Sequence, residues 1–420
     1  MQRAQSDLST ADSLNRITTR CDEEITSIES TLIELRRSLH AHPEPSGEEV
    51  ETSKFIARTL NDAGIPGTIC RDGLGVVADM TVGSPSADAP LIAIRGDIDA
   101  LRMPDEKAVR YASQVPNVAH ACGHDVHTSV LIGAALAASH LATNADGNTV
   151  DPGLRLRFLF QPAEETCQGA DWLVEQGVMD GVDAILGLHV DPERIVGKVG
   201  IRYGVLTANC DEVVIVVGGH GGHAARPHHT LDPIAASAHL VSTLYEFLPR
   251  SVDARNASVF TVGKIEGGYA PNVIPESVEM HGTLRTTDAE SRQLLQQRIR
   301  DICSGVEQSS GTRVEVRFQQ PLKSVDNHPR IAAALEEASL AVVGRENIDL
   351  IDQPSMGGED FSVYLDHAPG ALLRLGCADP ADDSPPFLHS SLFDVDERAI
   401  ALGARVLLRA AFLLGTPSHK

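Results

Sequence analysis

The order of predicted strands and helices constrains the fold of this chain more than any other feature. Between residues 209 and 322 the pattern is strand, helix, strand, strand, helix, strand, which is the order of a ferredoxin-like unit. On both sides of this unit, short apolar runs alternate with helical patterns, as in a mainly parallel sheet with helices on both faces. The sequence therefore predicts an α/β domain and a smaller α+β domain.

Hydrophobic periodicity and turn residues set the expected elements. Helices are predicted at 23–39, 48–63, 126–141, 233–247, 289–306 and 396–414. Strands are predicted at 75–80, 91–94, 154–160, 184–188, 211–217, 258–265, 277–286, 313–318 and 371–375.

Length, charge and cysteine content exclude several classes of protein. A chain of 420 residues is too long for one ordinary core, so two domains are expected. Asp and Glu outnumber Lys and Arg by 58 to 35, and the net charge of −23 argues against nucleic acid or an anionic membrane as partner. Seven cysteines without a repeated spacing fit a reducing compartment, so we expect a cytoplasmic protein.

The first residues and the apolar stretches bear on targeting. Residues 1–20 are polar and lack the apolar stretch of a secretory signal, so we expect a flexible leader there. No window approaches the roughly 20 apolar residues of a membrane-spanning helix. We therefore expect a protein that does not enter a membrane.

Side chains of the kinds that bind metal ions recur along most of the sequence. They are Cys122, His124, Glu164, Glu165, His189 and His389. One sulfur, three imidazoles and two carboxylates are more donors than one zinc ion needs, whereas a pair of divalent ions would use them all. If they share one centre, the last segment returns to the first domain. The expected division is then 21–208 with 323–420 as the metal-binding domain and 209–322 as an insertion.

Each of these motifs also has an ordinary structural explanation. Cys122 could be a buried cysteine beside a helix that Asp125 caps. A Glu-Glu pair is most often a solvated surface, although Glu164 and Glu165 follow a strand that Pro162 ends, where the sites of open α/β sheets lie. A single histidine is more often structural than a ligand. The coincidence of all these residues in one α/β domain favours a shared metal site.

The middle domain carries three further candidates. His223 follows two glycines, which suggests the close approach of another surface. Asn272 precedes Val-Ile-Pro, and Arg285 could bind a carboxylate through two parallel hydrogen bonds. Read alone, the glycines form an ordinary turn and Arg285 is a surface charge.

Together these segments resemble the M20 metallopeptidase family, and within it the amidohydrolases of N-acyl-amino acids, hippurate and indoleacetyl-amino acids. The resemblance covers nearly everything beyond the leader and rests on seven motifs in order. They are 35–44 (LRRSLHAHPE), 95–101 (RGDIDAL), 120–125 (HACGHD), 160–165 (FQPAEE), 221–228 (GGHAARPH), 272–275 (NVIP) and 355–361 (SMGGEDF).

The resemblance implies a catalytic domain around two metal ions, interrupted by a lid domain that commonly dimerises. The implied metal ligands are Cys122, His124, Glu165, His189 and His389. Glu164 would be the general base, and Asp97 and Asp99 would orient ligand histidines. In the lid, His223 would stabilise the oxyanion, often across a dimer. Asn272 and Arg285 would line the substrate site.

The implied reaction is metal-dependent hydrolysis of the amide bond of an N-acyl-amino acid to a carboxylate and a free amino acid. The expected ions are manganese or zinc, with cobalt or nickel as further candidates. A homodimer through the lid domain is also expected. The alternatives are a dipeptidase or short-chain aminoacylase of the same family, an enzyme with Cys122 as nucleophile and His124 as its base, and an inactive binding protein.

Overall fold

The computed structural model describes residues 2–86, 88–143 and 153–415, and the chain divides into two compact units. Unit 1 comprises Met1–Gly204, Asp326–Asp352 and Asp360–Lys420. Unit 2 comprises Val205–Val325 and Gln353–Glu359. The short segment 353–359 was expected in the first domain. It belongs to unit 2 because its backbone pairs with the first residues of that unit, with Ser355 N donating to Leu206 O at 2.9 Å.

Unit 1 is built around one large sheet. In spatial order its strands are β1 (Gly67–Ile69), β2 (Val76–Val82), β4 (Leu154–Gln161), β3 (Leu91–Asp97), β5 (Val182–Ile195), β16 (Gly370–Ala378), β6 (Val199–Ile201) and β15 (Ile348–Leu350). The four central strands β4, β3, β5 and β16 run parallel, and antiparallel pairs join β2 and β6 to them. Every residue of β3 is buried, as is typical of a central parallel strand. The predicted mainly parallel α/β domain is confirmed.

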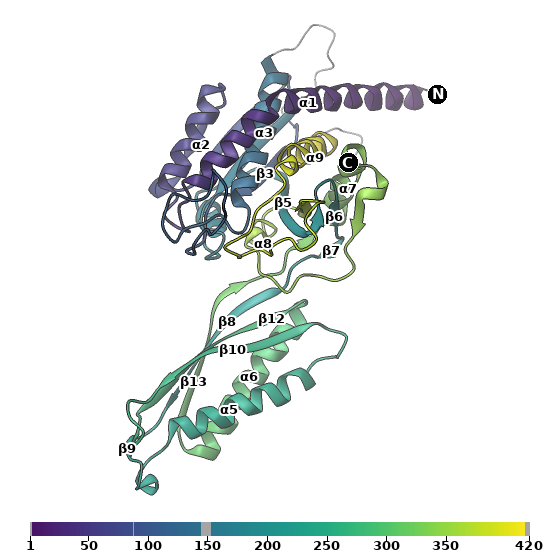
Figure 1. The fold of residues 1–420 in the computed structure, drawn as a ribbon. Coiled ribbons are helices and arrows are strands. Elements are labelled where there is room, and N and C mark those ends of the chain that lie inside the picture. Colours follow the sequence, from purple (N-terminus) through teal and green to yellow (C-terminus); the bar gives the residue numbers. More distant parts are fainter. Residues whose placement is uncertain (1, 87, 144–152, 416–420) are drawn as a thin grey trace. The chain divides into compact units, whose positions relative to one another are not determined.

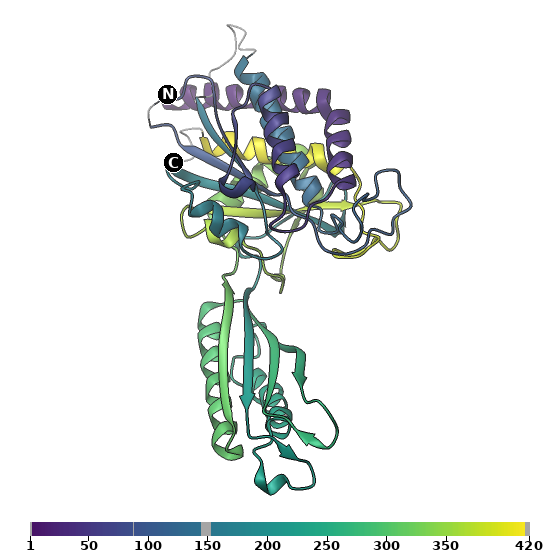
Figure 2. The same cartoon turned by 90° about the vertical axis from the view of Figure 1, so that its left-hand side faces the viewer.

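Helices cover this sheet, and the hydrophobic core lies between the helices and the strands. They are α1 (Gln2–Ala41), α2 (Val50–Asp62), α3 (His124–Thr143), α4 (Gly169–Val174), α7 (Pro329–Val343), α8 (Phe361–Tyr364) and α9 (Arg398–Gly415). Both α3 and α9 pack against β3 and against each other, and α1 packs on the two of them (Figures 1 and 2).

The segment expected to be a flexible leader is helical from Gln2 onward. The apolar stripe of α1 begins earlier than predicted, because Cys21 is fully buried one turn before Ile25. Thr18 is also buried, so the packed face of this helix begins at least as early as residue 18.

Unit 2 has the ferredoxin-like topology that the sequence predicts. Its main elements are β8 (Asn209–Gly218), α5 (Pro233–Phe247), β10 (Ser258–Gly267), β12 (Ser277–Thr286), α6 (Ala289–Ser310) and β13 (Arg313–Leu322). The strands form an antiparallel sheet in the order β10-β12-β8-β13, and α5 and α6 pack side by side on it (Figure 1). The side chains of Asp232 and Asp288 accept hydrogen bonds from the first turns of α5 and α6 and so fix where these helices begin.

Shorter elements complete the two units. The two-residue strands are β7 (Gly204–Val205), β9 (Gly222–His223), β11 (Val273–Ile274) and β14 (Asp326–Asn327). Short 3₁₀ helices occur at Arg71–Gly73, Pro227–His229, Leu248–Arg250 and Arg345–Asn347. Among the described residues, no helix has the length and apolar character that crossing a membrane requires.

Candidate metal centre

Cys122 and His124 meet at the N-terminal end of α3. Gly123 turns the chain between them with a φ of +83°, and a Cβ on it would lie 2.4 Å from Val190 Cγ2, so the turn requires glycine. Asp125 makes no cap of the expected kind, because its Oδ2 lies 2.7 Å from both Arg36 Nε and His40 Nδ1.

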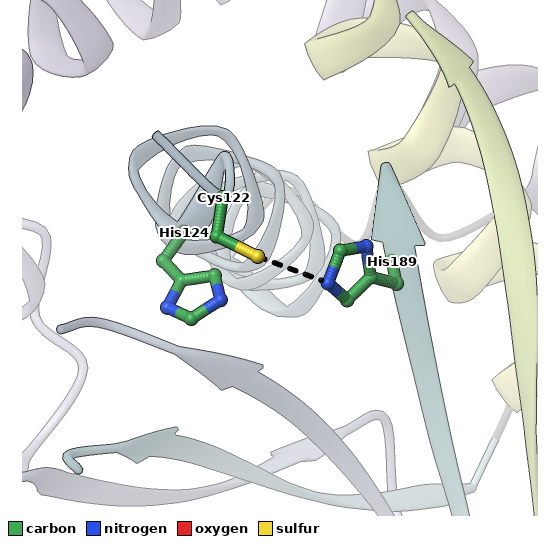
Figure 3. Close-up of side chains that lie close together, drawn as sticks. All are labelled: Cys122, His124 and His189. Atoms are coloured by element: carbon green, nitrogen blue, oxygen red, sulfur yellow. Dashed lines mark hydrogen bonds between the residues drawn. The ribbon is translucent and has the colours of Figure 1, made fainter. Parts of the chain in front are cut away.

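His189 approaches the same point from β5. It lies inside this strand, which runs on to Ile195, rather than at its end as predicted. Its Nδ1 lies 2.7 Å from Val190 O, where it can donate a hydrogen bond, and its Nε2 lies 3.5 Å from Cys122 Sγ. Figure 3 shows the sulfur of Cys122 directed at this ring, with His124 beside it.

His124 has one nitrogen that is held and one that is not. Its Nδ1 lies 3.0 Å from Asp99 Oδ1 and 3.1 Å from Asp99 O. Its Nε2 is buried and has no hydrogen-bond partner among the described residues. A histidine that binds a metal ion typically has one ring nitrogen held by a hydrogen-bond partner and the other nitrogen free to bind the ion. The two nitrogens of His124 have this arrangement.

Glu164 and Glu165 extend from the turn after β4. Glu164 is 7% exposed, and its Oε2 lies 3.9 Å from His124 Nε2. Glu165 Oε1 lies 3.3 Å from Nε2 of His389, which follows the loop before α9. Both carboxylates thus lie near His124, and Glu165 in addition pairs with His389.

Two groups of candidate ligand atoms share Cys122. Its sulfur lies within 4.8 Å of ligand atoms of His124 and His189, and likewise of ligand atoms of Glu165 and His389. One thiolate, three imidazoles and a carboxylate suit zinc, and the oxygen and nitrogen donors also suit manganese. The residues therefore fit a pair of divalent ions, and these two groups of side chains would hold them.

The protonation of these groups bears on the nucleophile hypothesis. Burial raises the pKa of the Cys122 thiol well above its usual value and lowers the pKa of His189 well below its own. A buried thiol of raised pKa is a poor nucleophile without a cation beside it. The sulfur lies beside both His124 and His189, with His189 Nε2 at 3.5 Å. Burial of the thiol thus disfavours Cys122 as a nucleophile.

Asp97 and His127 form a pair that the sequence reasoning missed. Asp97 was expected to orient a ligand histidine. Its Oδ1 lies 2.5 Å from His127 Nδ1, and its Oδ2 accepts a hydrogen bond from Arg95 and lies 3.8 Å from His124 Nε2. His127 Nε2 in turn accepts from Val190 N at 2.9 Å, which ties α3 to β5 beside His189. The spacing of three residues from His124 on one helix was the available signal.

Two of the three candidates of unit 2 lie together, and Arg285 lies apart from them. His223 pairs with Val273, and Ala224 N donates to Asn272 O at 3.1 Å, so His223 and Asn272 are neighbours, both exposed. Arg285 donates to Met356 O at 2.7 Å near the opposite end of β12.

Known proteins resemble the chain over most of its length. Residues 93–412 match the family described as peptidase family M20/M25/M40. The probable hydrolase sll0100 of Synechocystis sp. is 40% identical over 381 residues, which cover 91% of this chain and 95% of that protein. N-acetyl-L-cysteine deacetylase of Bacillus subtilis is 36% identical over 388 residues, with coverages of 92% and 89%. A solved structure from Bacillus subtilis, the YXEP protein, described as a dinuclear metal binding peptidase from the M20 family, has a TM-score of 0.78 and 32% identity and covers 93% of this chain and 99% of that one.

Proposed function

Because this chain belongs to peptidase family M20/M25/M40, whose members hydrolyse amide bonds, we propose that it cleaves N-acyl-amino acids to a carboxylate and a free amino acid. The observation that carries the proposal is the pair of ligand groups that share Cys122, with the carboxylate of Glu164 3.9 Å from His124. The named deacetylase among the relatives acts on a substrate of this chemical kind.

We propose that Cys122, His124, Glu165, His189 and His389 hold two divalent ions, manganese or zinc. When bound, these ions would polarise the scissile carbonyl and lower the pKa of a water molecule. Glu164 takes the proton of the attacking water and returns it to the departing amine. Asp99 keeps His124 in the tautomer that offers Nε2, because its carboxylate faces Nδ1.

Metal removal and a substrate panel test this proposal. Dialysis against a chelator is expected to abolish hydrolysis, and two equivalents of manganese or zinc per chain should restore it. A thiol alkylator applied to the metal-loaded protein should leave the rate unchanged, because the Cys122 thiolate is then a ligand. One bound ion per chain at full activity would contradict the paired site. Absence of turnover on every substrate would favour an inactive binding protein.

The size of the acyl group that the enzyme accepts distinguishes two related hypotheses, a hydrolase of hippurate-like conjugates and a short-chain aminoacylase. The panel should compare benzoyl-glycine, acetyl-amino acids and dipeptides with the same loaded protein. The name of the Bacillus subtilis relative favours a short acyl group as the second candidate. Preference for acetyl substrates by more than about tenfold in kcat/KM would support a short-chain aminoacylase.

We further propose a homodimer in which His223 acts on the site of the partner subunit. β12 is 10 residues long, so its ends are roughly 30 Å apart. Arg285 lies at one end of it, and His223 and Asn272 lie beyond the other, so one small substrate cannot touch both groups in a single chain. Exposed apolar side chains, among them Tyr245 and Ile265, and the unpaired edge of β10 offer unit 2 a surface for a second copy.

His223→Ala is expected to lower kcat by about 10²-fold, because a donor to the oxyanion is lost. Exposed His229 is the matched control, and His229→Ala should have no effect. Mixing equal amounts of His223→Ala and Glu164→Gln subunits should restore about a quarter of wild-type activity. About half of the dimers are then mixed, and each mixed dimer has one intact site out of two. No recovery after subunit exchange would exclude action across the dimer.

A further inference from the structure

Glu49 is a buried carboxylate for which the proposed mechanism has no role. It has no exposed surface and directly precedes α2, at the N-cap position. A side chain that caps a helix from this position accepts hydrogen bonds from the first helical amides. Glu49 makes no such bond, and the amide of Thr52 donates instead to Glu44 Oε2 at 2.7 Å. Glu44 therefore caps the helix, and the carboxylate of Glu49 serves another group.

That group is the turn that carries Glu164. Glu49 Oε1 accepts from Ala163 N at 2.8 Å and from Gly47 N at 2.9 Å. Ala163 has a φ of +52°, a left-handed conformation that a residue with a side chain adopts only where its surroundings hold it. The bond to Glu49 is such a constraint, and it acts on the residue directly before Glu164.

The amide on the other side of Glu164 is held as well. Glu165 N donates to Asp99 Oδ2 at 3.0 Å, and the same oxygen accepts from Ser46 Oγ at 2.6 Å. Ser46 thus contacts Asp99, which accepts the hydrogen bond of the Glu165 amide, and Glu49 accepts the hydrogen bond of the Ala163 amide. The backbone amides directly before and directly after Glu164 are therefore both bound to carboxylates.

We propose that Glu49 is a positioning residue that fixes the Ala163 amide and thereby aims Glu164 and Glu165 at the metal centre. The inference rests on the roles proposed for those two glutamates. Glu49 Oε2 has no hydrogen-bond partner in the described part of the chain, and burial, with the charge of Asp99, raises the pKa of Glu49 to about 7. Both hydrogen bonds to Glu49 end at Oε1, so the proposed role calls for an acceptor oxygen at that place, and glutamine supplies one.

Three substitutions at Glu49 test the positioning role. Glu49→Ala is expected to lower kcat about 10- to 100-fold, because the catalytic turn loses its anchor, while KM changes far less. Glu49→Gln should keep kcat within about threefold of wild type. Glu49→Asp keeps the charge but withdraws the oxygen, so it should resemble Glu49→Ala. Glu51→Ala, on the exposed face of α2, is the control and should behave as wild type.

Hydrogen exchange of the metal-free protein gives a readout that does not depend on turnover. The peptide that contains residues 163–167 should exchange faster in Glu49→Ala and Glu49→Asp than in wild type, Glu49→Gln and Glu51→Ala. Aspartate preserving both exchange and kcat while glutamine loses them would overturn the proposal, because charge would then be what matters. If the wild type hydrolyses no N-acyl-amino acid, the proposed function fails, whereas the exchange pattern still decides the role of Glu49.

Discussion

Glu164→Gln will lower kcat by about 10²- to 10⁴-fold, the range that a positioned general base contributes. Glutamine has nearly the same shape but cannot take a proton from water. Because Glu164 is only 7% exposed and lies between two held amides, the substituted side chain should keep its position. Metal content should stay at the wild-type value, since the base is not among the proposed ligands. Metal analysis and steady-state kinetics on the same sample check both parts.

The neighbouring residue is the matched control. Glu165→Gln should reduce the metal content, because the Glu165 carboxylate lies beside His389 and within reach of Cys122. Its loss of activity should therefore be partly reversed by excess metal, whereas that of Glu164→Gln should not. The opposite pattern, with metal lost from Glu164→Gln and retained in Glu165→Gln, would exchange the two roles and refute the assignment.

Helix boundaries were predictable where capping residues mark them. The predicted range 233–247 coincides with α5, because Asp232 caps the helix and Pro233 occupies its first turn. The predicted strand at 184–188 fell short of β5, which continues to Ile195 through Asp191 and Pro192. Proline usually ends a strand, but β3 pairs with β5 only as far as Gly187, and Pro192 lies in the irregular stretch between the pairs that Asp191 and Ile195 make with β16.

Predicting the site depended on how local each contact is. The turn between Cys122 and His124 and the pair of glutamates after β4 can be recognised from short motifs. The contact of Asp97 with His127 cannot, because Asp97 has two histidines within reach, His124 and His127, and only packing brings one of them into hydrogen-bond distance. The partner of Asp125 was also missed, since Arg36 lies in a helix 89 residues away.

Arg36→Met will destabilise unit 1 by about 3–5 kcal/mol, the effect of removing one partner from a buried ion pair. The guanidinium of Arg36 is fully buried, and its Nε lies 2.7 Å from Asp125 Oδ2 and its Nη2 3.0 Å from Asp394 Oδ1. Methionine fills much of the space but leaves the Asp125 carboxylate without this cation. Urea unfolding of the metal-free protein measures the change. Trp172 is the only tryptophan in the sequence and belongs to unit 1, so its fluorescence reports on that unit.

Arg37, the next residue, is the control that compares an exposed ion pair with the buried one of Arg36. Arg37 is 39% exposed and pairs with Glu397, so Arg37→Met should cost less than about 1 kcal/mol. Adding Asp125→Asn to Arg36→Met should recover part of the lost stability, because the uncompensated charge is then gone. A double variant as unstable as Arg36→Met would mean that lost packing, rather than the stranded carboxylate, dominates. Since Asp125 directly follows His124, recovered stability with weakened metal binding would show that the ion pair serves the position of the ligand and not only the fold.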